Sequence, residues 1–119
     1  MLNENMKKVL VALRSGEYEQ TRSTLQDSNG YCCLGVMCDV YERETGDEIK
    51  RDFDDYIKGH SLLHLPKVQQ WVGLFDKFGK FGKYISVDES SLAMMNDRDG
   101  KTFSEIADFI ESEPEGLLV

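Results

Sequence analysis

Hydrophobic residues recur every three or four positions along several stretches of this chain, which is the pattern of amphipathic helices. The first stretch begins near Asn3 and ends at Ser15 and Gly16, a pair suited to a glycine C-cap. The second covers residues 31–45 and is followed by Gly46, and we expect it to be the central helix. Its apolar stripe consists of Cys33, Leu34, Met37, Val40 and Tyr41.

Three further helices are predicted in the second half of the chain. Pro66 suits the first turn of a helix, because the missing N–H is not needed there. The apolar face that follows consists of Val68, Trp71, Val72 and Phe75. A short helix is expected around residues 92–95, capped by Asp88 or Ser90. Residues 102–105 read Thr-Phe-Ser-Glu, a capping box that should open the last helix.

The remaining segments predict turns and short extended pieces. Residues 18–25, rich in Thr and Tyr, are expected to form a short strand or an extended loop. Residues 27–30 end in Asn-Gly, which favours a turn with positive φ. The glycines of residues 78–83 predict a loop or hairpin, with a strand at residues 84–87.

The pattern as a whole predicts one helix-dominated α+β domain over residues 1–119. We expect three or four short helices, a small antiparallel sheet or hairpin, and a loose tail at residues 114–119. Gly35 stands inside the central helix, where glycine costs about 1 kcal/mol relative to alanine. We therefore expect a neighbouring backbone to approach the helix closely at this position.

The charge of the chain limits its partners. The formal net charge is −8 and the sequence pI is about 4.7. A protein that follows a nucleic-acid backbone needs the opposite sign, so direct nucleic-acid binding is disfavoured and a basic partner is favoured. No apolar run is long enough to span a membrane, and the N-terminal sequence does not have the pattern of a signal peptide.

Three cysteines and two histidines are the residues with the clearest potential for chemistry. Cys32, Cys33 and Cys38 lack the spacing of a zinc site, and their odd number fits a reducing compartment. His60 and His64 are four residues apart, as a metal pair on a helix would be, but Gly59 disfavours a long helix there. We expect no metal and no cofactor. Weak candidates for a nucleophile are Cys32 and Cys38, against the alternative that all three cysteines are core residues.

Two surface segments are candidates for binding. An acidic face that could contact a basic partner consists of Asp47, Glu48, Asp52, Asp54 and Asp55. The alternative is an ordinary solvated face. A second segment could hold a nucleotide by stacking and charge; it consists of Lys77, Phe78, Lys80, Phe81, Lys83 and Tyr84. The alternative there is a hairpin whose aromatic rings fold into the core.

Five segments in order along the chain resemble a family of small proteins of unknown function from tailed bacteriophages. They are residues 13–20, 31–39, 65–74, 92–97 and 103–111, and the second reads Tyr-Cys-Cys-Leu-Gly-Val-Met-Cys-Asp. The resemblance implies a phage accessory protein in the cytoplasm of a bacterial host. It supplies no catalytic residues.

From this setting we expect non-catalytic binding that counters host defence or redirects host metabolism. The protein would sequester a nucleotide-like signal or occlude a host protein. One alternative is a small cysteine-dependent enzyme, and another is a structural or virion-associated protein. Whether the chain forms a homo-oligomer is left open, although symmetric assembly could build a deeper pocket than one small domain holds.

Overall fold

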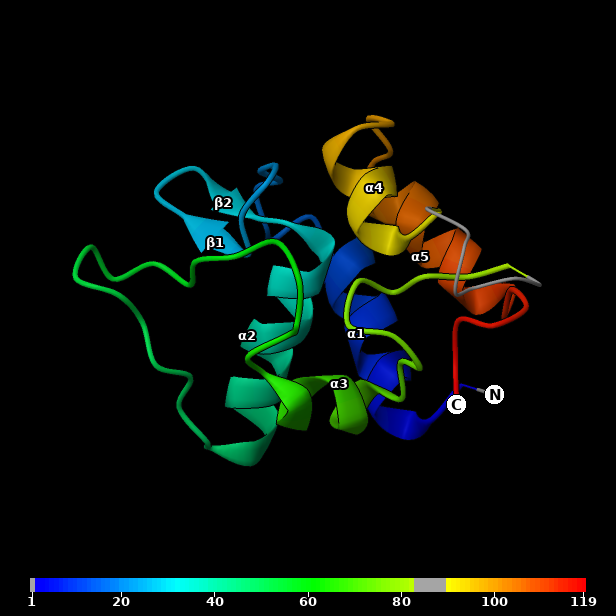
Figure 1. Ribbon diagram of the computed structural model, residues 1–119, viewed down its shortest axis with the longest axis horizontal. Helices are drawn as coiled ribbons and strands as arrows, with labels where there is room; N and C mark the ends of the chain where they lie inside the picture. Colours follow the sequence, from blue (N-terminus) through cyan, green and yellow to red (C-terminus); the bar gives the residue numbers. More distant parts are fainter. Residues whose placement is uncertain (1, 83–89) are drawn as a thin grey trace.

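The computed structural model describes residues 2–82 and 90–119 of the chain (Figure 1). Within these residues it contains five helices and one two-stranded antiparallel hairpin, an α+β fold. The elements are α1 (Glu4–Arg14), β1 (Gln26–Asp27), β2 (Gly30–Tyr31), α2 (Cys33–Thr45), α3 (Pro66–Val72), α4 (Leu92–Asp97) and α5 (Phe103–Glu111). The predicted fold class is confirmed, with one helix more than the upper expectation of four.

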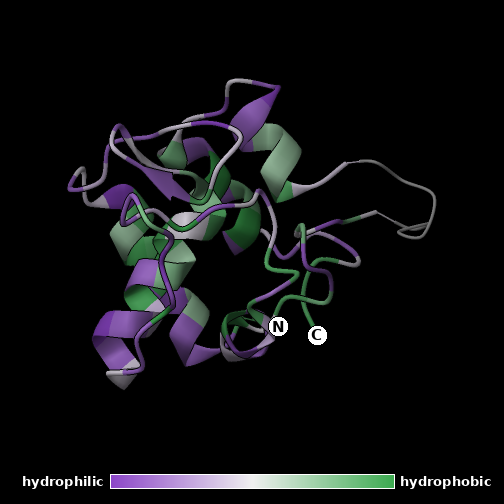
Figure 2. Cartoon of the chain, turned by 60° about the vertical axis from the view of Figure 1, so that its left-hand side comes forward, coloured by the Kyte–Doolittle hydropathy of each residue, from purple (hydrophilic) through white to green (hydrophobic). Residues whose placement is uncertain are grey.

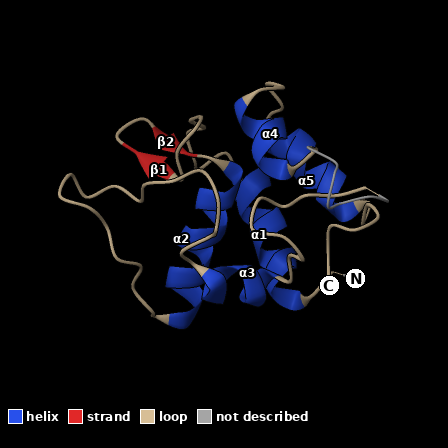
Figure 3. Ribbon diagram, viewed as in Figure 1, coloured by secondary structure: helices blue, strands red, loops and turns tan. Residues whose placement is uncertain are grey.

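The core forms where α1 packs between α2 and α5, with α3 against one end of α1 and α2 (Figures 1 and 3). The predicted stripe of α2 is confirmed, because all five of its side chains are at most 7% exposed. α1 contributes its own stripe to the same core, and α5 packs on it from the other side. Burial of these apolar faces, at roughly 25 cal/mol per Å², is the main force that holds the helices together.

Gly35 lies against the backbone of Leu25, as its place in a helix predicted. A Cβ added at Gly35 would be 1.7 Å from the Leu25 carbonyl oxygen, a distance that no side chain tolerates. The same carbonyl accepts a hydrogen bond from the Cys32 N–H at 3.1 Å. The segment before the hairpin is thereby seated directly on the first turn of α2.

Helix ends follow local sequence signals closely, with two exceptions. Thr102 and Glu105 form the reciprocal capping box that their spacing predicted. The cap of α4 is Ser91, whose hydroxyl accepts from the Met94 N–H at 3.1 Å, and neither of the two predicted residues takes that place. Helix α3 ends at Gly73, in the left-handed conformation, so Phe75 leaves the predicted buried face and is 60% exposed.

The hairpin lies at residues 26–31, around the predicted Asn-Gly turn. The Asp27 carboxylate accepts from the N–H groups of Asn29 and Gly30, at 2.8 and 3.2 Å, and so closes the turn. A sheet or hairpin had been expected further along the chain. The predicted strand at residues 84–87 and the candidate cap Asp88 lie outside the described residues.

The C-terminal segment is packed onto the domain, which corrects the prediction of a loose tail. Leu117 is fully buried, and its carbonyl accepts from the Phe75 N–H at 3.0 Å. The Val119 N–H donates to the Gly73 carbonyl at 2.9 Å. Figure 2 shows this segment as hydrophobic, in contrast to the largely hydrophilic loops. Leu117 therefore folds into the core and Leu118 packs against it, whereas the Val119 side chain remains 74% exposed.

Candidate functional site

Residues 46–65 connect α2 to α3 and form the most extensive loop of the described chain, called here the α2–α3 loop. In Figure 1 it extends away from the helices on the left-hand side. Three surface pockets of about 270, 390 and 530 Å³ lie along it, and Lys50 lines all three. The three pockets therefore neighbour one another along the loop.

A bidentate ion pair fixes the base of this loop to α2. Arg51 donates from its two terminal nitrogens to the two carboxylate oxygens of Glu42, at 2.7 and 2.9 Å. Glu42 also accepts from the Ile49 N–H at 2.8 Å, while the Ile49 side chain is buried. Hydrogen bonding from Arg51 lowers the pKa of Glu42, and partial burial opposes this effect. The loop thus has a defined path where it leaves the helix.

The tip of the loop is a turn organised by Asp52. One carboxylate oxygen of Asp52 accepts from the N–H groups of Asp54 and Tyr56, both at 2.9 Å. The Asp52 N–H donates to the Tyr56 carbonyl at 2.9 Å, and Lys58 lies 3.2 Å from the second carboxylate oxygen. The hydrogen bonds from the Tyr56 and Asp54 N–H groups, with Lys58, lower the pKa of Asp52. These bonds, all made between residues 52–58, hold the turn in shape.

Phe53 stands on this turn with its side chain fully in solvent, at 103% relative exposure. Aromatic side chains are enriched in the cores of protein interfaces relative to the rest of the surface, so an exposed ring on an ordered turn is a candidate contact with another molecule. The turn that carries it is already ordered, so little conformational entropy is lost when the ring is buried by a partner.

The five acidic residues predicted as a face fall into two groups. Asp47 and Asp52 have internal roles: Asp47 accepts from the Tyr41 hydroxyl and lies 4.0 Å from Lys67, and Asp52 closes the turn. The other three are exposed and have no ion-pair partner within the described part of the chain. They are Glu48, Asp54 and Asp55. The surface around Phe53 therefore carries unneutralised negative charge.

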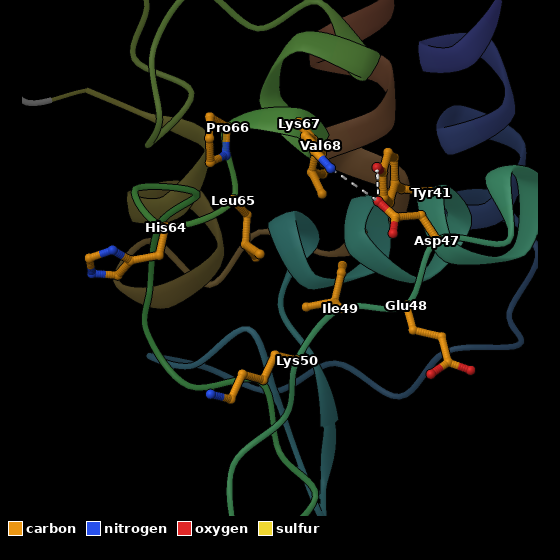
Figure 4. A pocket seen from close by; sticks show the side chains of 10 residues that line it. All are labelled: Tyr41, Asp47, Glu48, Ile49, Lys50, His64, Leu65, Pro66, Lys67 and Val68. Carbon is orange, nitrogen blue, oxygen red and sulfur yellow. Dashed lines mark hydrogen bonds and ion pairs between the residues drawn. The ribbon is translucent and has the colours of Figure 1, made fainter.

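The pocket of about 270 Å³ has a mixed lining that lacks a converging set of reactive groups (Figure 4). Ile49, Leu65 and Val68 supply apolar surface, and Asp47 is held between Tyr41 and Lys67. In Figure 4 the Glu48 side chain points to one side of the pocket, and the Lys50 and His64 side chains point to the other. Such a surface suits contact with another molecule better than it suits catalysis.

The cysteines proposed as weak nucleophile candidates are deep in the core. Cys32 is the N-cap of α2, where its sulfur accepts from the Gly35 N–H at 3.4 Å, and it is 3% exposed. Burial raises the pKa of the Cys32 thiol to about 12 and raises the pKa of the Cys38 thiol as well. A nucleophilic cysteine needs the opposite shift and an accessible sulfur. The geometry thus favours the packing role for both residues.

The basic and aromatic segment is divided between core and surface. Phe81 packs on Phe109 with ring centroids 4.6 Å apart, which is the core alternative. Phe78, like Phe81, is partly buried against the core, and the amines of Lys77 and Lys80 lie 5.7 and 6.0 Å from the Phe78 ring centroid. The two remaining predicted residues, Lys83 and Tyr84, lie outside the described residues.

The two histidines have different surroundings. Residues 60–64 are not helical, so the helical spacing that suggested a metal pair does not apply. His60 lies against Phe78, with centroids 5.7 Å apart, whereas His64 lines the pockets beside Leu65. Among residues 2–82 and 90–119 no three His, Cys, Asp or Glu side chains gather as a metal site would require.

The sequence did not single out Phe53 or the pair of Glu42 and Arg51. Phe53 was visible only as one apolar residue in an acidic stretch, a signal that a core residue of a weak strand would also give. The ion pair joins residues nine positions apart across a loop, and no local sequence pattern predicts it. None of the helices in the described chain has the length and hydrophobicity needed to cross a membrane.

The fold and these surfaces define a small α+β domain with a structured, projecting loop. The chain belongs to the family described as Domain of unknown function (DUF8296), whose model matches residues 1–114. Comparison with curated proteins and with solved structures finds no match.

Proposed function

We propose that this protein acts by non-catalytic binding and occludes a partner protein through the α2–α3 loop. The observation that carries the proposal is Phe53, a fully exposed aromatic ring on a turn that hydrogen bonds already hold in shape. Aromatic side chains that enter a pocket of a partner supply much of the binding energy in protein interfaces. A preorganised turn avoids the entropy that a flexible loop would lose.

The charges around Phe53 indicate the chemistry of the partner. Asp54 and Asp55 directly follow Phe53 on the turn and are exposed, Glu48 is exposed on the same loop, and the whole chain has a net charge of −8. An apolar pocket bordered by lysines or arginines would match both features. The long-range field would also speed the encounter with such a partner, an effect that salt weakens.

The biological setting rests on the resemblance to small proteins of tailed bacteriophages. In that setting the partner is a host bacterial protein in the cytoplasm, and its occlusion counters host defence or redirects host metabolism. The buried thiols, with raised pKa values, speak against the cysteine-dependent enzyme as the alternative. A partner-binding role needs no cofactor.

The test is quantitative capture of host proteins by the immobilised chain, with identification of the captured protein and measurement of its affinity. Phe53→Ala should lower the affinity at least about tenfold, the usual effect of truncating an aromatic anchor. Phe75→Ala is the matched control, because Phe75 is also exposed, at 60%, but stands outside the loop. If both variants bind as the unchanged protein does, the loop is not the binding element and the proposal is wrong.

A further inference from the structure

A second surface, independent of the α2–α3 loop tip, lies on the turn formed by residues 76–80. One carboxylate oxygen of Asp76 accepts from the N–H groups of Phe78 and Lys80, at 2.7 and 3.3 Å. The Gly79 N–H donates to the Asp76 carbonyl at 3.0 Å, and the Lys77 carbonyl accepts from the Leu62 N–H at 2.9 Å. The backbone that carries both lysines is therefore fixed.

Two ammonium groups converge on one aromatic ring at this turn. The Nζ atoms of Lys77 and Lys80 lie 5.7 and 6.0 Å from the centroid of Phe78. Neither lysine has a carboxylate ion-pair partner within residues 2–82 and 90–119, although the chain has 22 acidic residues. Both ammonium groups lie near one ring, and an anion bound on this turn would accept charge-assisted hydrogen bonds from them.

A surface hollow is linked to the Phe78 ring through His60. His60 is in contact with Phe78, at 5.7 Å between centroids and 39° between planes. The same histidine lines a surface pocket of about 490 Å³ whose other lining residues are Ser23, Met94, Asp97 and Arg98. That volume is within the range of small-molecule sites.

We propose that this surface binds a nucleoside phosphate. The phosphate lies between Lys77 and Lys80, and the base lies in the hollow against His60 and Met94. Imidazole and thioether groups both pack well on an aromatic base. Two charged residues of the hollow already have partners: the Asp97 carboxylate accepts from the Ser23 N–H at 2.9 Å, and Arg98 is paired with Asp99 at 2.9 Å. Lys77 and Lys80 have no ion-pair partner within residues 2–82 and 90–119, so the phosphate of the ligand lies toward the lysines.

A longer nucleic acid is a poorer fit to the same groups. Two lysines can neutralise few phosphates, and the net charge of −8 repels a polyanion beyond the first contacts. A single nucleotide places its charge only where the two ammonium groups lie. The class of ligand is thus a small nucleotide, and this inference does not depend on the partner-binding role of Phe53.

The experiment is calorimetric titration of the whole protein with AMP, GMP, CMP and UMP, and with inorganic phosphate and adenosine as reference probes. At least one nucleotide should bind more tightly than either reference probe. The double variant with Lys77→Ala and Lys80→Ala should weaken its binding at least about tenfold, as loss of charge-assisted hydrogen bonds does. Lys101→Ala is the control, because Lys101 is an exposed lysine that lines neither this hollow nor the pockets of the α2–α3 loop.

The histidines supply a second matched pair. His60→Ala should weaken nucleotide binding severalfold and leave phosphate binding unchanged, whereas His64→Ala, at another exposed position, should change neither. Equal affinity for phosphate and for every nucleotide would overturn the base site. Absence of binding at millimolar nucleotide would overturn the whole inference. Capture of a partner protein through Phe53 should be the same in the variants of Lys77, Lys80 and His60, so failure here is distinguishable from failure of the proposed function.

Discussion

Arg51 donates hydrogen bonds to both carboxylate oxygens of Glu42, and this contact anchors the base of the α2–α3 loop to α2. Both side chains are largely shielded from solvent, at 24% and 15% exposure for Arg51 and Glu42. The pKa of Glu42 is lowered from its ordinary value of 4.5, chiefly by the hydrogen bonds from Arg51. Folding therefore favours the ionised carboxylate, and the stabilisation is present above about pH 4.5 and is lost as the pH falls through the lower folded-state pKa.

The first prediction concerns this pair. Glu42→Gln should lower the free energy of unfolding at pH 7 by about 1 kcal/mol, since the pair is partly solvated and its coulombic energy is screened. The difference from the unchanged protein should shrink as the pH falls below about 4.5. Urea unfolding at pH 7 and pH 3 measures it, with Glu44→Gln on the exposed side of the same helix as control. A difference that is the same at both pH values contradicts the role assigned to Arg51.

The second prediction concerns the contact of Gly35 with Leu25. Alanine favours a helix over glycine by about 1 kcal/mol, but a Cβ at this site overlaps the Leu25 carbonyl oxygen. The steric cost should exceed the gain in helix propensity, and Gly35→Ala should destabilise the protein by about 3 kcal/mol or more. Gly46→Ala is the comparison, because a Cβ added at Gly46 would have no neighbouring atom within 4 Å, so that only its φ of 76° opposes the substitution. It should cost only about 1 kcal/mol. Thermal unfolding of both variants checks the order.

The third prediction separates two cysteines by their environment. Cys32→Ser should change the stability little, because a serine hydroxyl can accept from the Gly35 N–H as the sulfur does and is a favourable N-cap. Cys38→Ser should cost about 1–3 kcal/mol, because it places a hydroxyl at a fully buried position of α2. Chemical denaturation of both variants provides the test, and equal losses would contradict the capping role of Cys32.

The same burial predicts slow thiol chemistry. Because burial raises the pKa values of all three cysteine thiols, they are protonated at neutral pH and shielded from reagents. Titration of the native protein with Ellman's reagent at pH 7.5 should show slow modification, limited by opening of the fold. The three thiols should then react at once in denaturant. Rapid reaction of one thiol in the native protein would revive the enzyme alternative.

The fourth prediction concerns the charges beside Phe53. Replacing Asp54 and Asp55 by asparagine should slow association with a basic partner severalfold, and should weaken its dependence on salt. The dissociation rate should change much less than it does in Phe53→Ala. The matched control replaces Glu17 and Glu115, two exposed acids elsewhere, by glutamine. Stopped-flow or surface-binding kinetics at two salt concentrations distinguish the variants, and equal effects from both pairs would mean that only net charge matters.

Sequence reasoning succeeded where the signal is local. The stripe of α2, the capping box at Thr102, the turn at Asn29 and the left-handed Gly46 all depend on residues within a few positions of one another. Even the contact at Gly35 could be predicted, because glycine in a helix has a known cost that only a tight approach explains. These features fixed the class of fold.

The features that failed prediction depend on contacts distant in the chain. Leu117 is apolar and follows a helix-ending proline, and its burial depends on packing against residues far earlier in the sequence. In the sequence Phe75 continues the apolar stripe of α3, but the helix ends at Gly73 and the Phe75 ring is exposed. For Phe53 the sequence could not distinguish a strand residue from an exposed ring. Phe53 is exposed because the Asp52 side chain organises a turn at this position in place of a strand.

The docked C-terminal segment has a practical consequence for the assays described above. The Leu2 N–H donates to the Glu113 carboxylate at 2.9 Å, and Val119 bonds to Gly73, so both ends of the described chain are held on one side of the domain. In Figure 1 that side is opposite the α2–α3 loop. A fusion partner or surface tether attached at either end therefore leaves Phe53 free to face the solution. Truncation of the last residues to shorten such a linker would instead remove the buried Leu117 side chain from the core.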